Sequence, residues 1–256
     1  MPENGVFHNL ILAKINVSYP GHAQQMMHAF WGVGQMSFVK HAIFVGADAP
    51  ELDDDEAITK WILNRLDVEE LLITKGVVDA LDHSSPRFAL GGKMGLDCTG
   101  DEVNELGIKI KEDEKLLKKI KKIDSNVVDL KQYYLDTKNP ICIVTVNKER
   151  SQKELFKELQ TLFKNIKILV IVDEKNNDLD NLYMLLWRVV NNIDSNRDIF
   201  IEGHTIGIDA TNKNKLDNFQ RRWPDDVICT ESVIEDLRKR GILDISDQFI
   251  KQFGLI

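Results

Sequence analysis

The sequence contains one α/β pattern twice, and such a repeat limits the chain to a fold built from two similar halves. Three pairs of segments match in the same order along the chain. They are residues 9–15 with 139–145, residues 42–45 with 169–172, and the Gly-hydrophobic-Asp-x-Thr motifs at 95–99 and 207–211. In the first pair, Ile11 matches Ile141. We therefore interpret the chain as one duplicated unit.

The first copy is longer than the second at two places. It has about three extra residues near Tyr19-Pro20-Gly21-His22 and about fifteen between Lys75 and Met94, and both stretches are loops of the kind that carry function on rigid scaffolds. The second copy folds without them, so the scaffold does not need them. We therefore expect the functional residues in the first copy.

Within each copy, short apolar runs alternate with segments of helical periodicity, which is typical of βαβ units in a parallel sheet. We expect strands near 8–17, 42–45, 70–74, 141–146, 168–172 and 198–201, and helices near 23–32, 53–66, 151–163 and 179–191. The expected fold class is α/β, with two tandem βαβαβ-type lobes, a mainly parallel sheet and C-terminal helices.

We expect four segments along the chain. They are a first α/β lobe with the functional loops (1–104), a charged connecting segment containing a solvated helix (105–136), a second, degenerate lobe (137–214) and a C-terminal helical arm (215–256). The arm ends in an apolar tail, residues 249–256, which needs a partner surface.

Composition excludes several classes of protein. The formal net charge of −8 disfavours binding to nucleic acid or to anionic lipid. Cys98, Cys142 and Cys229 are odd in number and contain no Cys-x-x-Cys pair, so we expect neither a disulfide framework nor a zinc site. No apolar stretch reaches the about 18 residues of a membrane span, and the opening residues do not form a signal peptide. We expect a cytoplasmic protein.

Three places carry candidate functional residues. His22 follows a Pro-Gly turn at the start of a predicted helix, where a hydrogen-bonding role is the commoner one. Lys40 precedes a strand, and its spacing alone indicates a solvated lysine. Residues 79–95 place Asp82, His83 and Lys93 beside Phe88 and Leu90, a mixture typical of a loop that lines an apolar pocket with a few polar groups. No motif among them specifies a reaction.

Taken together, the motifs resemble the C-terminal region of UbiD-family decarboxylases over residues 7–100. They are Tyr19-Pro-Gly-His-Ala23, Trp31-Gly-x-Gly-Gln35 with Lys40, Arg65-Leu-Asp67, Asp79-x-Leu-Asp-His-x-Ser-Pro86 and Gly92-Lys-Met-Gly-Leu-Asp97-x-Thr99. Residues 206–213, followed by Arg222-Trp223-Pro224, resemble the closing segment of that family.

The resemblance implies reversible, non-oxidative decarboxylation of aromatic or α,β-unsaturated acids on prenylated FMN with Mn²⁺ and K⁺, and a place in quinone biosynthesis. The family's catalytic Glu-Arg-Glu network and its metal ligands lie ahead of this region. The resemblance therefore implies that this chain is a region that promotes oligomerisation and completes the active site, and that it is inactive alone. The implied partners are further copies of the chain and the N-terminal flavin-binding domains, and none of the cofactors is expected to bind this chain tightly by itself.

The resemblance also assigns residues. It implies that Lys40 contacts the flavin phosphate and that Phe88 and Leu90 face the substrate, while His22, Asp82, His83 and Lys93 order loops; it assigns no catalytic and no metal-binding residue here. Two alternatives stay open. One is a stand-alone nucleotide-binding α/β enzyme that uses Lys93, and the other is a purely structural oligomerisation scaffold.

Overall fold

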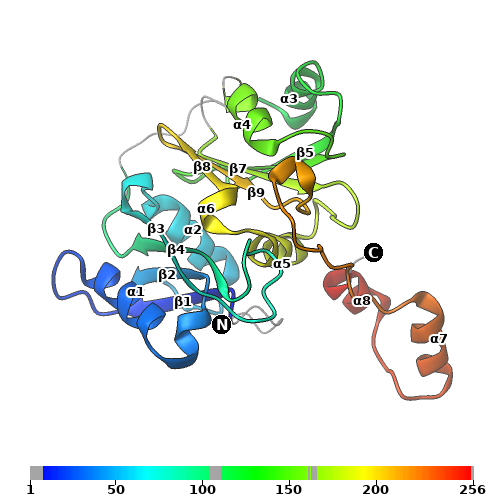
Figure 1. Cartoon of the computed structure of the whole chain (residues 1–256), viewed down its shortest axis with the longest axis horizontal. Coiled ribbons are helices and arrows are strands. Elements are labelled where there is room, and N and C mark those ends of the chain that lie inside the picture. Colours follow the sequence, from blue (N-terminus) through cyan, green and yellow to red (C-terminus); the bar gives the residue numbers. More distant parts are fainter. Residues whose placement is uncertain (1–7, 104–110, 161, 163–165, 255–256) are drawn as a thin grey trace.

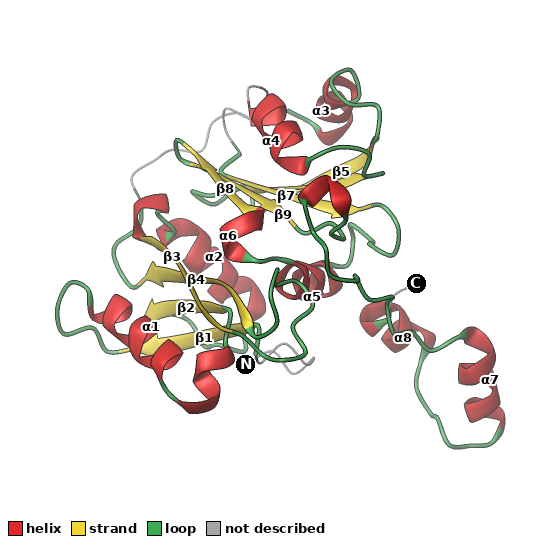
Figure 2. Ribbon diagram, viewed as in Figure 1, coloured by secondary structure: helices red, strands yellow, loops and turns green. Residues whose placement is uncertain are grey.

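The computed structural model describes residues 8–103, 111–160, 162 and 166–254. Two sheets enclose a layer that contains helices α2 (Asp55–Arg65) and α5 (Leu182–Asn192) (Figures 1 and 2). Helix α1 (His22–Gly32) packs on the outer face of the first sheet, and α3 (Asp113–Ile120) and α4 (Gln152–Gln160) pack on the outer face of the second. The fold is therefore a layered α/β structure.

The two sheets repeat one strand order. The first is β1-β2-β4-β3, formed by β1 (Leu10–Ile15), β2 (His41–Gly46), β4 (Leu90–Cys98) and β3 (Leu71–Val77). The second contains β6 (Ile141–Val146), β7 (Ile168–Asp173), β9 (Thr205–Asp209) and β8 (Ile199–Glu202) in the corresponding order. In each sheet the first three of these strands are parallel and the fourth is antiparallel. This repetition confirms the expected α/β fold class.

In a simple βαβαβ unit the third strand in chain order is parallel to the other two. In this chain the third strand of each copy, β3 or β8, is antiparallel to its neighbour. A hairpin connects it to the next strand, so it forms an antiparallel edge, whereas a parallel neighbour would need a crossover connection.

The strand register locates the repeat. Ala42 pairs with Gly95 and Leu169 pairs with Gly207, as the sequence match requires. In the first strand, however, Ile11 pairs with Ala42 and Cys142 pairs with Leu169. The residue equivalent to Ile11 is thus Cys142, and the sequence match to Ile141 is wrong by one position. Strands covered on both faces are apolar throughout, so their hydrophobic pattern does not fix the alignment.

The repeated glycines have a repeated packing role. A Cβ atom on Gly95 would lie 2.3 Å from Met27 Sδ of α1, and one on Gly207 would lie 2.5 Å from the Phe156 ring of α4. In both copies, therefore, the glycine lets the first helix approach the sheet closely.

The inner faces of both sheets contribute to one hydrophobic core. Val45 and Leu96 of the first sheet belong to the same buried cluster as Val170 and Ile206 of the second. Both inner helices also belong to it, through Ile58 and Leu185. The two lobes are therefore joined by burial of their inner faces, while the domain boundaries expected from the sequence stay a prediction.

The segment expected to connect the lobes contributes to the second one. Leu116 and Ile120 of α3 are buried, because their spacing of four residues forms an apolar stripe against the sheet. Strand β5 (Val127–Tyr133) then adds an antiparallel edge beside β6. The solvated helix expected here is thus half-buried, and β5 was not anticipated. Residues 104–110 of this segment lie outside the described residues.

The remaining elements are short. They are η1 (Gly34–Phe38), η2 (Val68–Glu70), α6 (Ser195–Asp198), η3 (Lys215–Asp217), α7 (Glu231–Lys239) and α8 (Asp247–Phe253). The expected C-terminal helices are confirmed, and α7 extends away from the sheets (Figure 1). Phe253 packs edge-on against Tyr183 of α5, whereas Phe249 is 49% exposed. The end of the apolar tail, residues 255–256, lies outside the described residues.

We expect Gly95→Ala and Gly207→Ala each to lower the free energy of unfolding by about 1–3 kcal/mol, because the added methyl group overpacks the contact with α1 or α4. Urea denaturation of the purified chain measures this. The control is Gly32→Ala, since a Cβ atom there has no neighbour within 4 Å. Equal midpoints for all three variants would contradict the packing role.

Candidate functional site

The long insertion of the first copy is the loop of the β3–β4 hairpin, residues 78–89. The second copy closes the equivalent hairpin between β8 and β9 with Gly203 and His204 alone. Because β4 runs parallel to β1 and β2, this loop lies at the amino ends of those strands. Lys40, the residue before β2, lies at the same edge, opposite to the carboxyl edge where α/β sheets usually bind ligands.

A buried ion pair fixes the loop. Lys40 Nζ lies 2.8 Å from Asp82 Oδ1, and the two side chains are 1% and 3% exposed. Lys40 Nζ also donates to Ser84 Oγ at 2.8 Å and to the carbonyl of Val190 at 3.4 Å. Burial by itself would raise the pKa of Asp82, but Lys40 and the hydrogen bonds from Ser84 and Ser85 outweigh it and lower that pKa to about 2. The pair is thus charged and closed to solvent.

Lys93 is buried too, but it contacts a different element. Its Nζ donates to the carbonyls of Ser37 and Val39, both at 2.7 Å, and so ties the η1 segment to β4. Burial, followed by the nearby charge of Lys40, lowers the pKa of Lys93 to about 8. An ammonium group engaged in this way offers little to a nucleotide phosphate, so the geometry does not favour the alternative of a nucleotide site at Lys93.

His41 is a buried residue of this region that the sequence patterns did not indicate. Burial, with a further contribution from Lys40, lowers its pKa to about 3, so the ring is neutral. Its Nδ1 lies 3.5 Å from Ser195 Oγ of the second lobe. The only local signal is its position beside Lys40 at the start of a buried strand.

His83 lies in the loop against the second lobe. Its Nε2 is 3.2 Å from Asn192 Oδ1, and its ring packs edge-on against Trp223 with the centroids 4.7 Å apart. Burial lowers the pKa of His83. Asp82, His83 and Lys40 are therefore brought together, and the second lobe covers them.

The apolar side chains of the loop have the opposite arrangement. Phe88 is 73% exposed, and Leu81 is 90% exposed, whereas Leu90 at the start of β4 is half-buried. A loop with its polar groups inside and its large apolar groups outside presents a surface for another molecule.

His22 lies apart from this group. It begins α1 after the carboxyl end of β1, at the edge of the sheet opposite to the loop. Its ring stacks on Tyr19 with the centroids 4.8 Å apart, and its Nδ1 accepts a hydrogen bond from the Ser18 amide. These contacts fit an ordering role for the turn between β1 and α1, not for the β3–β4 loop.

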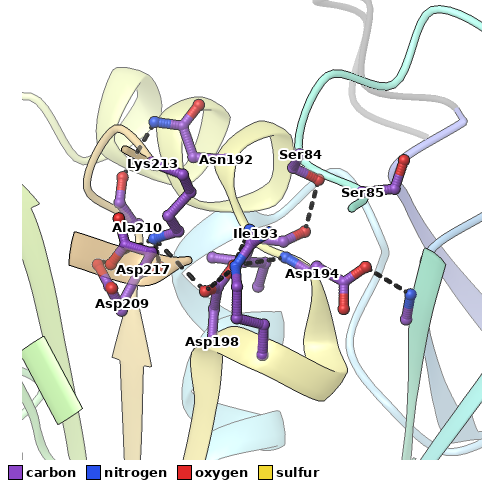
Figure 3. A network of polar contacts seen from close by, with 12 residues as sticks. Ser84, Ser85, Asn192, Ile193, Asp194, Asp198, Asp209, Ala210, Lys213 and Asp217 are labelled. Carbon is purple, nitrogen blue, oxygen red and sulfur yellow. Dashed lines mark hydrogen bonds and ion pairs between the residues drawn. The ribbon is translucent and has the colours of Figure 1, made fainter. Parts of the chain in front are cut away.

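A polar network from the second lobe reaches the loop at Ser84, which donates to the Ile193 carbonyl at 3.0 Å, and reaches the start of β4 next to the loop (Figure 3). Asp194 Oδ2 accepts a hydrogen bond from the Gly92 amide at 2.7 Å, and a Cβ atom on Gly92 would lie 2.6 Å from Asp194 Oδ1. Behind it, Asp198 accepts from the Asp194 amide and lies 3.5 Å from Lys213 Nζ. The Gly91-Gly92 pair is the sequence feature that allows this close approach.

Within the described residues, no group of three or more His, Cys, Asp or Glu side chains is placed to hold a metal ion. Cys98, Cys142 and Cys229 are free, and burial raises the pKa of the Cys98 thiol to about 12. Among the helices of the described ranges, none has the length and apolar character of a membrane span.

The duplicated sheets, the shared inner helices and the loop on its buried ion pair define a tandem α/β domain. The family model described as the 3-octaprenyl-4-hydroxybenzoate carboxy-lyase C-terminal domain matches residues 1–98 and 108–219. The chain therefore belongs to the UbiD family, in its C-terminal region, as the sequence motifs indicated.

The chain is also similar, over all or part of its length, to curated relatives and to solved structures. A protein of Helicobacter pylori strain 26695 is 51% identical over 256 residues, covering 100% of this chain and 41% of that protein, and an Aquifex aeolicus protein is 36% identical over 99 residues, covering 39% and 20%. The chain thus spans less than half of these relatives. The UbiD-class enzyme HmfF from Pelotomaculum thermopropionicum in complex with FMN matches at 27% identity over 45% of this chain and 25% of its own, with a TM-score of 0.32. Vanillic acid decarboxylase from Sedimentibacter hydroxybenzoicus matches at 17% identity over 66% and 43%, with a TM-score of 0.40.

We expect Lys40→Met to destabilise the chain by about 3–5 kcal/mol, because it leaves the Asp82 carboxylate buried and unpaired. The double variant Lys40→Met with Asp82→Asn should recover part of that loss. Lys75→Met, at an exposed position of β3, is the control. Urea denaturation measures the wild type and the three variants. A double variant no more stable than Lys40→Met would contradict the pairing.

We expect His41 to make stability depend on pH. Its pKa is depressed in the folded chain, so its contribution is present above the ordinary value of 6.5 and is lost as the pH falls toward about 3. The difference in unfolding free energy between wild type and His41→Asn should shrink by about 1.4 kcal/mol per pH unit across that window. Parallel stability profiles between pH 7.5 and 5 would show that His41 titrates normally.

Proposed function

We propose that this chain is the C-terminal region of a UbiD-family decarboxylase, where it completes the active site and promotes assembly. The family match over residues 1–98 and 108–219 supports this, together with the 41% of the Helicobacter pylori relatives that the chain spans. The remainder of such a protein has room for the flavin-binding and catalytic domains. The substrates would be aromatic or α,β-unsaturated acids, quinone biosynthesis is the proposed pathway, and the cytoplasm is the proposed location.

The observation that carries the proposal is the form of the β3–β4 loop. Its polar side chains are locked around the Lys40–Asp82 pair, and Phe88 is exposed from it. A fixed loop that presents a phenyl ring can form one wall of a pocket for an aromatic acid. In this proposal Phe88 and Leu90 contact the substrate, and Asp82, His83 and Lys93 hold the surrounding segments in place.

The described residues do not fit a complete cofactor site. The Lys40 side chain is 1% exposed and its Nζ has three oxygen acceptors, so a phosphate contact would require it to leave Asp82. No metal cluster is placed among these residues either. We therefore derive no chemical step on a flavin or metal from this chain. Prenylated FMN, Mn²⁺ and K⁺ would be held by the flavin-binding domains, and Lys40 would act through the loop.

Assembly is the second part of the proposal. The C-terminal arm exposes three large apolar side chains: Val233 of α7, Phe249 of α8 and Ile242 between the two helices. Exposed apolar side chains of this kind favour contact with another subunit. A homo-oligomer, a dimer or larger, is the proposed state of the whole enzyme.

The test compares this chain with a chimaera in which it replaces the matching region of the Helicobacter pylori relative. In an FMN fluorescence titration with Mn²⁺ and K⁺, we expect saturable quenching by the chimaera and none by the chain alone. With prenylated FMN, only the chimaera should release CO₂ from a panel of aromatic acids. Quenching or turnover by the chain alone would contradict the completing role, and so would a chimaera that binds no FMN when the unmodified relative does.

In the active chimaera, we expect Phe88→Ala to raise KM for an aromatic acid about tenfold, because one wall of the pocket loses its ring. The matched control is Leu135→Ala, a 46% exposed apolar residue in the second lobe. Steady-state kinetics measure both. An unchanged KM for Phe88→Ala would remove Phe88 from the substrate pocket.

A further inference from the structure

The β3–β4 loop is held largely by the second lobe. Lys40 and Ser84 donate to the carbonyls of Val190 and Ile193 at the end of α5, and His83 meets Asn192. The contacts of Ser84 and His83 cover one side of the loop, and Lys40 links the loop carboxylate of Asp82 to the same helix end. Another side is covered by the segment after η3, residues 218–226.

Arg221 is the polar contact from that segment. Its Nη1 donates to three oxygen atoms of the loop: the Asp82 carbonyl at 3.1 Å, the Ser85 carbonyl at 2.8 Å and Ser85 Oγ at 3.1 Å. Lys40 holds the carboxylate of Asp82, and Arg221 holds its backbone. The turn from Asp82 to Ser85 is therefore held by two cations, Lys40 at its carboxylate and Arg221 at its backbone.

The segment that carries Arg221 is itself anchored on both sides. Phe219 is buried at 5% exposure and packs edge-on against Trp223, which in turn packs on His83. Beyond Trp223, Asp226 forms a two-point ion pair with Arg188 of α5, at 2.7 and 3.0 Å. Arg188 is buried at 4% exposure, so this end is fixed to the inner helix.

We propose that Arg221 is a positioning residue for the decarboxylase site: it fixes residues 82–85, and through them the placement of Phe88. This inference rests on the proposed function. It also gives the second copy a role. That copy carries no long loop of its own, but it supplies the surface on which the loop of the first copy is ordered, and the C-terminal arm that follows it supplies the arginine.

The neighbouring arginine provides a matched control. The Arg222 side chain is 88% exposed, and among the described residues its ion pair is with Asp225, 3.6 Å away, so Arg222→Ala removes the same charge as Arg221→Ala outside the contacts with the loop. Arg221→Lys is the conservative variant. Since a single nitrogen of Arg221 makes all three contacts, an ammonium group with three donors can replace part of them.

Hydrogen exchange on the chain tests the ordering without any activity assay. We expect Arg221→Ala to speed exchange of the amides in residues 79–90 about tenfold relative to those of β6 and β7, because a local network is lost while the core stays folded. Arg221→Lys should lie between Arg221→Ala and wild type, and Arg222→Ala should match wild type. Equal acceleration in the loop and in β6 and β7, or none in the loop, would overturn the proposal.

Kinetics of the chimaera test the consequence for the site. Arg221→Ala should raise KM for the acid by a larger factor than it lowers kcat, and Arg222→Ala should change neither. A loop that exchanges faster while KM stays unchanged would also overturn the proposal. If the unmodified chimaera were inactive on every acid, the proposed decarboxylase function would be wrong, and so would the positioning role of Arg221 in it. The exchange data would still show whether Arg221 orders the loop.

Discussion

The charge on Lys40 is the constraint around which the two lobes are arranged. An ammonium group removed from water must be surrounded by acceptors, because an unpaired buried charge is very costly. Here three acceptors come from two places in the chain: Asp82 and Ser84 of the loop, and the Val190 carbonyl of α5. Satisfying one lysine therefore fixes the start of β2, the β3–β4 loop and an inner helix of the other lobe relative to one another.

The contact between the lobes is reciprocal, as expected when equivalent surfaces of a duplicated unit meet. In the first copy, the carbonyls of Leu63 and Leu66 near the end of α2 accept hydrogen bonds from the Asn139 side chain of the second copy. The equivalent carbonyls of the second copy, those of Val190 and Ile193, accept from Lys40 and Ser84 of the first. The donor to the first pair of carbonyls is the side-chain amide of Asn139, whereas the donors to the second pair are the Lys40 ammonium group and the Ser84 hydroxyl. The two contacts therefore differ where the long loop is inserted.

Sequence patterns predicted the elements well where hydrophobic periodicity decides them. The repeat, the strands β1, β2, β6 and β7 and the helices α1, α2, α4 and α5 follow from it, and β6 spans the residues expected, whereas β4 and β9 were not among the expected strands. The antiparallel edges did not follow, because an apolar run does not state the direction of its neighbour. In the site, the sequence placed Asp82, His83 and Lys93 in one segment. It could not indicate that Lys93 binds the carbonyls of Ser37 and Val39, or that Arg221 and not Arg222 contacts the loop, since both depend on partners distant in sequence.

The inverted polarity of the loop explains why a second copy would be retained. A loop that buries Asp82 and Ser84 while exposing Leu81 and Phe88 gains little from its own hydrophobic burial, so its conformation depends on polar contacts with a surface outside it. The second copy provides that surface within the same chain at the end of α5, and the C-terminal arm adds Arg221. Because these contacts are intramolecular, the loop is ordered without a separate binding equilibrium.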